Sequence, residues 1–185
     1  MDRKILIVTG DGGEGYEVLY AVHRFQEAGL VPVLAAPSKR LLNLVMHDFE
    51  PGWDTYVERP GYRREADIAI ADVRSDDYEA ILLAGGRAPE YLRNDAKLKA
   101  LVREFHAHDK WIFSICHGIQ IITAAGLAKG RNLTCYEHVR SEVEACGGTF
   151  VAQSCVRDGN MVSAQTWQDH PSFFREVFKC LDAHK

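Results

Sequence analysis

Short, continuous runs of apolar residues alternate along this chain with longer segments of helical periodicity. The apolar runs predict strands buried on both faces, because they lack the polar alternation of a half-exposed strand. These strands are expected at 4–9, 31–36, 80–83 and 111–115. Helices are expected at 16–28, 96–108 and 119–125, near 139–146, and after the capping residue Ser172. Alternating strands and helices predict an α/β three-layer sandwich, with helices on both faces of a mostly parallel sheet.

Two regions depart from this alternation. Between residues 41 and 73 the pattern loosens, and only short strands are expected, at 54–57 and 66–70, with Pro60–Gly61 as a turn. Close to the C-terminus, Asp158–Gly159 predicts the turn of a hairpin between two further strands.

Length and composition favour one domain over residues 1–185, with 46% hydrophobic and 26% charged residues. A net charge of −4 without a basic cluster argues against a nucleic-acid partner. No apolar stretch has membrane-spanning length, so no membrane partner is expected.

The five cysteines form no CxxC pair and no secretion signal precedes them, which predicts reduced thiols and a cytoplasmic location. Neither HExxH nor paired Cys/His spacing occurs, so no metal site is expected.

The predicted strand at 111–115 runs directly into Cys116, His117 and Gly118, and a helix is expected to follow. Cys116 would then lie at a helix amino end, where backbone N–H groups favour the thiolate, the reactive form of the side chain. A sharp strand–nucleophile–helix turn of this kind positions the nucleophile in many hydrolases. Cys116 is therefore a candidate nucleophile. The alternative is a small buried apolar residue, because free cysteines are often buried.

Three loops are expected to meet at the carboxyl ends of the strands, where α/β sheets bind their ligands. They are the loops at 10–15, 85–90 and 116–118. In the second loop, the N–H groups of Gly85 and Gly86 would form an oxyanion hole together with those of the cysteine corner. The alternative for the two glycines is a tight turn that needs a positive φ.

Glu17, in the first turn of the first helix, would point across the strand ends toward Cys116. Beside a thiolate its pKa would be raised, so the carboxyl would stay protonated and donate a hydrogen bond to sulfur. The alternative is a glutamate that complements the helix dipole. Glu14 fits a solvated loop position better.

Because neighbours on a helix do not face each other, no ion pair between Cys116 and His117 is expected. His117 would act as a base if a carboxylate oriented it.

Taken together, Glu17, the GGRAPE motif at 85–90 and the SICHG motif at 114–118 resemble the PfpI branch of the DJ-one/PfpI superfamily over essentially the whole chain. The segment His47–Asp48–Phe49 is most similar to plant DJ-one-type proteins described as cofactor-independent glyoxalases. The resemblance implies a flavodoxin-like sandwich and a strained nucleophile elbow at the cysteine, hydrogen-bonded to the acid of the first helix. It also implies that Glu90 of a neighbouring subunit reaches the histidine, in a homo-oligomer that is a dimer, a trimer or a hexamer built on dimers.

The leading hypothesis is a glyoxalase of type III, which converts methylglyoxal or glyoxal to a 2-hydroxy acid without a cofactor. Cys116 would attack the aldehyde to form a hemithioacetal, and Glu17 or His117 would move a proton between the adjacent carbons. Backbone N–H groups near Gly86 and His117 would hold the oxyanion. The expected partner besides a second copy is the small aldehyde substrate.

Two alternatives remain open from the sequence. One is a hydrolase with a different substrate, either an intracellular cysteine peptidase of PfpI type or a deglycase that acts on early glycation adducts. The other is a non-catalytic redox sensor or chaperone, in which Cys116 is oxidised to the sulfinic acid and Glu17 stabilises the product. A class I glutamine amidotransferase is disfavoured, because no His-x-Glu motif follows the cysteine.

Overall fold

The computed structural model describes residues 3–183. Its strands are β1 (Lys4–Val8), β2 (Val31–Ala36), β3 (Leu41–Asp48), β4 (Val57–Glu65), β5 (Ile68–Ala69), β6 (Ala80–Leu83), β7 (Trp111–Ile115), β8 (Asn132–Leu133), β9 (Thr149–Phe150), β10 (Cys155–Asp158) and β11 (Met161–Ala164). The α-helices are α1 (Gly15–Glu27), α2 (Ala88–Leu92), α3 (Ala96–Ala107), α4 (Ile119–Ala124), α5 (Arg140–Ala145) and α6 (His170–Asp182).

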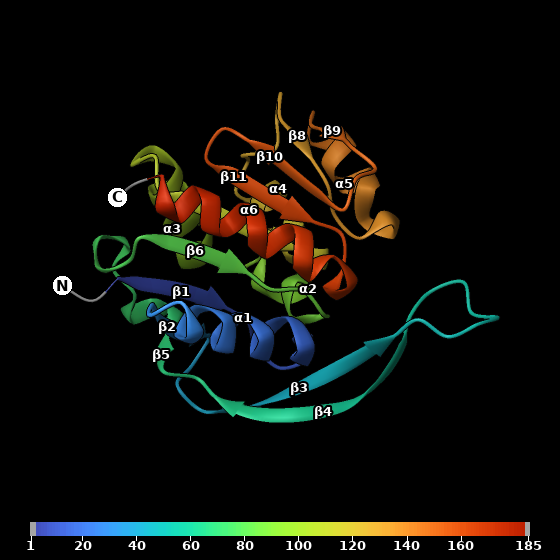
Figure 1. Cartoon of the computed structure of the whole chain (residues 1–185), viewed down its shortest axis with the longest axis horizontal. Helices are drawn as coiled ribbons and strands as arrows, with labels where there is room; N and C mark the ends of the chain where they lie inside the picture. The colour runs from blue at the N-terminus through green and yellow to red at the C-terminus, as the bar shows by residue number, and fades with distance from the viewer. Residues whose placement is uncertain (1–2, 184–185) are drawn as a thin grey trace.

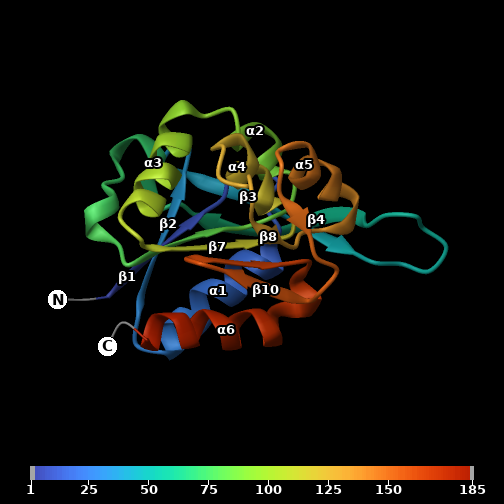
Figure 2. The ribbon, with the colours of Figure 1, turned by 90° about the horizontal axis from the view of Figure 1, so that it is seen from above.

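The main sheet has seven strands in the order β10-β11-β7-β6-β1-β2-β5 across these residues. All neighbouring pairs are parallel except β10 and β11, which form the hairpin predicted at Asp158–Gly159. Helices α1 and α6 cover one face of the sheet, and α2, α3, α4 and α5 lie on the other (Figures 1 and 2). The expected α/β sandwich is confirmed.

Alternating side chains of the central strand β1 build the two halves of the core. Ile5 and Ile7 pack in the cluster that includes the apolar sides of α1 and α6. Leu6 and Val8 pack in the opposite cluster, with α3 and α4. Because both faces are covered, the strand is apolar throughout, as its sequence predicts. No helix within residues 3–183 is both long enough and apolar enough to cross a bilayer.

Residues 41–65 differ most from expectation, because they form one long antiparallel hairpin, β3–β4, which projects beyond the main sheet (Figure 1). The short strand expected at 54–57 is wrong, and the one expected at 66–70 is reduced to the two residues of β5. Pro60–Gly61 lies inside β4 rather than in a turn. It is tolerated there because the pairing register shifts between Asn43 and Val45, opposite this point. The exposed, charged side chains of β4 conceal its strand character in the sequence.

Smaller differences concern helix starts. The last helix begins at His170 rather than after Ser172, and Ser172 Oγ donates to the carbonyl of Asp169 at 3.0 Å. Helix α2 was not expected, since five residues carry too little periodicity to be recognised.

The loops that follow β1, β6 and β7 meet at one edge of the sheet, because these three strands are adjacent. Gly13 and Gly86 form an isolated bridge between the first two loops. Beside it, the N–H of Glu14 donates to the carbonyl of Gly85 at 3.2 Å and that of Arg87 to the carbonyl of Gly12 at 2.7 Å. The predicted convergence of loops is confirmed, and it defines the region of the candidate site.

Candidate active site

Cys116 stands at a sharp corner between β7 and α4. Its φ of 58° lies in the left-handed region, which costs a non-glycine residue about 1–3 kcal/mol. Cys116–Gly118 forms a single 3-10 turn before α4 begins. A Cβ at Gly118 would lie 2.1 Å from the carbonyl oxygen of Leu83, so only glycine lets the corner approach β6 this closely. The backbone thus holds the sulfur at the edge where the loops converge.

The carboxyl of Glu17 reaches this corner from the first turn of α1. Its Oε2 accepts a hydrogen bond from the N–H of Gly85 at 2.6 Å, and the side chain is buried. Burial, reinforced by the nearby Glu14 carboxyl, raises the pKa of Glu17 well above its ordinary value, while the contacts with Gly85 and Cys116 oppose the shift. This direction favours the protonated carboxyl that the sequence predicts.

Burial also raises the pKa of the Cys116 thiol, with a further contribution from the Glu17 carboxyl. The N–H groups of His117 and Gly86 act in the opposite direction. The backbone N–H groups therefore act in the expected direction, but burial outweighs them, and the net shift does not favour the thiolate. The Glu17 carboxyl changes the pKa of the thiol and the thiol changes that of the carboxyl, so the two groups titrate as a coupled pair.

His117 lies directly against the sulfur, with Nδ1 3.3 Å from Cys116 Sγ. The expectation that adjacent residues would not face each other is wrong here, because it assumes that both are helical and Cys116 is not. Burial lowers the pKa of His117 to about 4, and His47 and His138 add smaller contributions. The imidazole is consequently neutral at pH 7, and its contact with sulfur is a hydrogen bond rather than an ion pair.

Gly85 separates the nucleophile from the acid. A Cβ at this position would lie 2.6 Å from the Cβ of Cys116 and 2.7 Å from Oε2 of Glu17. Gly86 follows with a φ of +78°, which supports the expectation of a turn that needs glycine. The pair therefore permits close packing and presents the N–H groups that face Glu17 and Cys116.

Replacing Gly85 with alanine is expected to force Cys116 and Glu17 apart. Overpacking of this kind destabilises a protein by about 1–3 kcal/mol, which thermal unfolding would detect. The added methyl group should also change the rate at which iodoacetamide alkylates Cys116, followed by mass spectrometry of the peptide. An alanine variant with wild-type stability and an unchanged alkylation rate would contradict this geometry.

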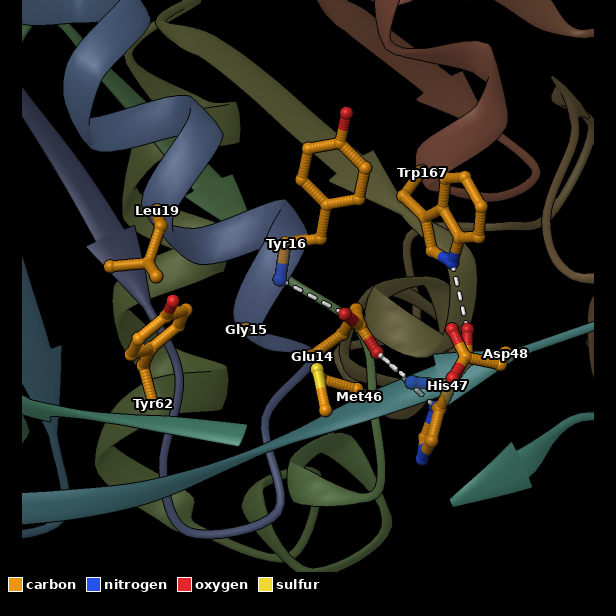
Figure 3. A pocket seen from close by; sticks show the side chains of 9 residues that line it. All are labelled: Glu14, Gly15, Tyr16, Leu19, Met46, His47, Asp48, Tyr62 and Trp167. Carbon is orange, nitrogen blue, oxygen red and sulfur yellow. Dashed lines mark hydrogen bonds and ion pairs between the residues drawn. The ribbon is translucent and has the colours of Figure 1, made fainter. Parts of the chain in front are cut away.

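Glu14 is buried, whereas a solvated loop position was expected. The reason is the unpredicted hairpin, whose strand β3 covers it. Oε1 of Glu14 accepts from the N–H of Tyr16 at 2.9 Å and Oε2 from the N–H of His47 at 2.7 Å (Figure 3). Burial raises the pKa of Glu14 to about 7, against the lowering effect of these two hydrogen bonds. Glu14 thus caps α1 and ties it to β3.

A cavity of about 320 Å³ opens beside Glu14, between α1 and the hairpin (Figure 3). Its lining consists of Glu14, Gly15, Tyr16, Leu19, Met46, His47, Asp48, Tyr62 and Trp167. Trp167 closes one side, and its Nε1 donates to the carbonyl of His47 at 2.9 Å. Cys116 does not line this cavity. His47 links this cavity to the cysteine corner, because its ring also stacks on Tyr56, which packs against His117.

Two tyrosines, Tyr56 from the hairpin and Tyr136, form an aromatic cover over the cysteine corner. The rings of Tyr56 and Tyr136 lie 5.9 and 5.2 Å from that of His117 and 5.5 Å from each other. His47 stacks on the outer tyrosine, Tyr56, at 3.9 Å. Under this cover Cys116 is 6% exposed and His117 5% exposed. The sequence pattern does not predict this aromatic cover, because Tyr56 reaches the site only through the long-range pairing of β3 and β4.

Glu90 lies on α2 and is exposed. Within residues 3–183 of one chain, no hydrogen bond joins its carboxyl to His117. The role implied by the resemblance, in which this carboxylate comes from a neighbouring subunit, stays a prediction.

Comparisons with known proteins identify the family of this chain. The sequence profile of the DJ-1/PfpI family matches residues 3–180. The chain is 36% identical over 97% of its length to Protein DJ-1 homolog D of Arabidopsis thaliana and spans 48% of that longer protein. It is 34% identical to a protein of Thermococcus kodakarensis named a deglycase, over 96% of this chain and 99% of the relative. The solved structure of Drosophila melanogaster DJ-1beta superposes with a TM-score of 0.79 at 19% identity, covering 96% of this chain and 89% of that one. The chain therefore belongs to the DJ-1/PfpI family.

Proposed function

We propose that this protein is a cofactor-independent glyoxalase that converts methylglyoxal or glyoxal to the corresponding 2-hydroxy acid. The observation that carries the proposal is the arrangement around Cys116. A buried Glu17, whose pKa is raised by burial, lies near the thiol, and a neutral imidazole contacts the sulfur at 3.3 Å. One nucleophile, one acid and one base at a water-poor corner are the groups that an internal transfer of hydrogen between two carbons requires.

The first step is addition of Cys116 to the aldehyde. The thiol proton passes to His117 and then to the former carbonyl oxygen, and the new S–C1 bond gives a hemithioacetal. The N–H groups of Gly86 and His117, which already act on the sulfur, would hold the developing oxyanion.

The second step isomerises the hemithioacetal. His117 removes the proton from C1 while Glu17 protonates the oxygen on C2, which gives an enediol. The imidazolium then protonates C2, and the Glu17 carboxylate takes the proton of the oxygen on C1. The product is a thioester of a 2-hydroxy acid, with both side chains back in their starting forms. Water then cleaves the S–C1 bond, which releases lactate or glycolate and the free thiol.

The test is an assay with methylglyoxal in D₂O, without glutathione, added metal or nicotinamide. We expect lactate that carries deuterium at C2, because the proton passes through an imidazole that exchanges with solvent. Lactate that keeps the original hydrogen at C2 would contradict the proton-transfer step. The absence of lactate would contradict the glyoxalase itself.

A second candidate function is deglycation of early glycation adducts, favoured by the 34% identity to the Thermococcus protein named a deglycase. The same cysteine would attack the carbonyl-derived carbon of an adduct. To separate the two functions, release of free amine from a preformed adduct is compared with depletion of free methylglyoxal under the same conditions. Amine release that only follows loss of the free aldehyde would favour the glyoxalase.

The proposed assembly is a homo-oligomer in which Glu90 of a neighbouring subunit orients His117. The support is the exposure of Glu90 on α2 and the absence of a carboxylate bonded to His117 within the described part of one chain. An acid supplied in this way would fix the imidazole in the tautomer that the first step needs.

A further inference from the structure

The loop that joins β3 and β4 extends beyond the main sheet before the chain turns back into β4 (Figure 1). Its returning part, residues 54–56, is called the strap here. Two hydrogen bonds join the strap to the segment after β8. Thr55 Oγ1 lies 2.9 Å from the hydroxyl oxygen of Tyr136, and His138 Nε2 lies 2.9 Å from the carbonyl oxygen of Asp54.

The strap holds half of the aromatic cover in place. Tyr56 belongs to it, and the Tyr136 hydroxyl that Thr55 contacts belongs to the other half of the cover. The two rings lie against His117, and the cysteine beneath is almost fully shielded. A substrate must therefore fit beneath or between the tyrosines to reach the sulfur.

The remaining charged contacts of the loop do not anchor it to the cover. Arg59 pairs with Asp48 at 2.7 Å and with Glu50, so these contacts close the hairpin on itself. Thr55 is exposed, while Tyr136 is buried. The Thr55–Tyr136 hydrogen bond thus connects a solvent-facing loop to a packed ring of the site.

We propose that the strap, latched by the hydrogen bond between Thr55 and Tyr136, determines substrate specificity by restricting the site to small dicarbonyl compounds. The inference rests on the proposed function and deepens it. With the latch closed, a two- or three-carbon dicarbonyl reaches Cys116, whereas a dicarbonyl that carries an aromatic ring, or one attached to a protein, is hindered by the aromatic cover. Opening the latch widens the range of substrates without touching the nucleophile, the acid or the base.

The first experiment compares kcat/KM for phenylglyoxal and methylglyoxal. The variants are Thr55→Val, Tyr136→Phe and the double variant, since either change removes the same hydrogen bond. We expect each single variant to raise the phenylglyoxal-to-methylglyoxal ratio about fivefold, the factor that one neutral hydrogen bond of ordinary strength represents. The double variant should add nothing beyond Tyr136→Phe, which already removes the hydrogen bond to Thr55 together with the contact of the Tyr136 hydroxyl with the backbone of Tyr56. Thr149→Val, the same change at an exposed threonine of β9, is the matched control and should leave the ratio unchanged.

The second experiment needs no turnover. Cys116 is modified with iodoacetamide or with the bulkier N-phenylmaleimide, and the Cys116 peptide is quantified by mass spectrometry. The latch variants should speed modification by the maleimide about fivefold more than modification by iodoacetamide. Wild-type ratios in the folded latch variants, in both experiments, would overturn the strap proposal. Changed modification ratios without any turnover of dicarbonyls would instead overturn the proposed function and support the strap as a gate.

Discussion

Replacement of Cys116 by alanine is expected to abolish production of lactate from methylglyoxal. The variant lacks the atom that forms the hemithioacetal, and no second cysteine lies at the corner to replace it within residues 3–183. The other buried cysteines, Cys135 and Cys180, lie elsewhere in the core. The measurement is a steady-state assay without glutathione on purified protein whose folding has been checked by circular dichroism.

Cys180→Ala is the matched control for this prediction. It makes the same change at a fully buried cysteine in α6, so it should lower stability and leave turnover intact. Full activity in Cys116→Ala would end the glyoxalase proposal. Loss of activity in both variants would show that the assay reports stability rather than chemistry.

Replacement of Glu17 by glutamine is expected to lower kcat by a factor on the order of 10²–10⁴, the usual contribution of a positioned acid or base. Glutamine has the size of the protonated acid, and its carbonyl oxygen can still accept from the N–H of Gly85. It cannot give up and recover a proton, so the isomerisation step loses its acid. The rate of Cys116 alkylation should change far less than kcat. A variant with wild-type kcat would assign the proton transfer to His117 alone.

The same substitution is expected to stabilise the fold at neutral pH. Burial raises the pKa of Glu17 above its ordinary value of 4.5, so the folded state holds the proton more tightly than the unfolded chain. The wild-type free energy of unfolding therefore falls as pH rises above about 4.5, where the unfolded chain ionises first. Glutamine lacks this dependence. The Tm of Glu17→Gln should exceed that of the wild type at pH 7, by about 2–4 °C for each kcal/mol gained in the free energy of unfolding. The difference should vanish below about pH 4.5.

The parts of the site that were predictable from sequence are those fixed by the parallel sheet. Cys116, Gly85 and Glu17 come together because β7, β6 and β1 are neighbours whose carboxyl ends share one edge. Apolar runs reveal such strands directly, since both of their faces are buried. The upward direction of the Glu17 pKa shift was predictable from the same adjacency.

The parts that were not predictable depend on long-range pairing or on one unusual torsion. Glu14 is buried and Tyr56 reaches the site because β3 pairs with β4, and the charged residues of β4 give no strand signal. The contact of His117 with the sulfur depends on the positive φ of Cys116, which no spacing rule reveals. The direction of the thiol pKa shift depends on how completely the corner is shielded, which is a property of the packed fold.

The left-handed backbone at position 116 has a consequence for how this chain is maintained through evolution. Glycine adopts that torsion without penalty, so selection for folding by itself would favour glycine at this corner. A cysteine at this corner strains its own backbone, so stability of the fold does not account for its presence, whereas the chemistry proposed for its sulfur does. Relaxed selection on the chemistry should therefore leave its earliest trace at this one codon, as drift toward a more stable but inactive protein.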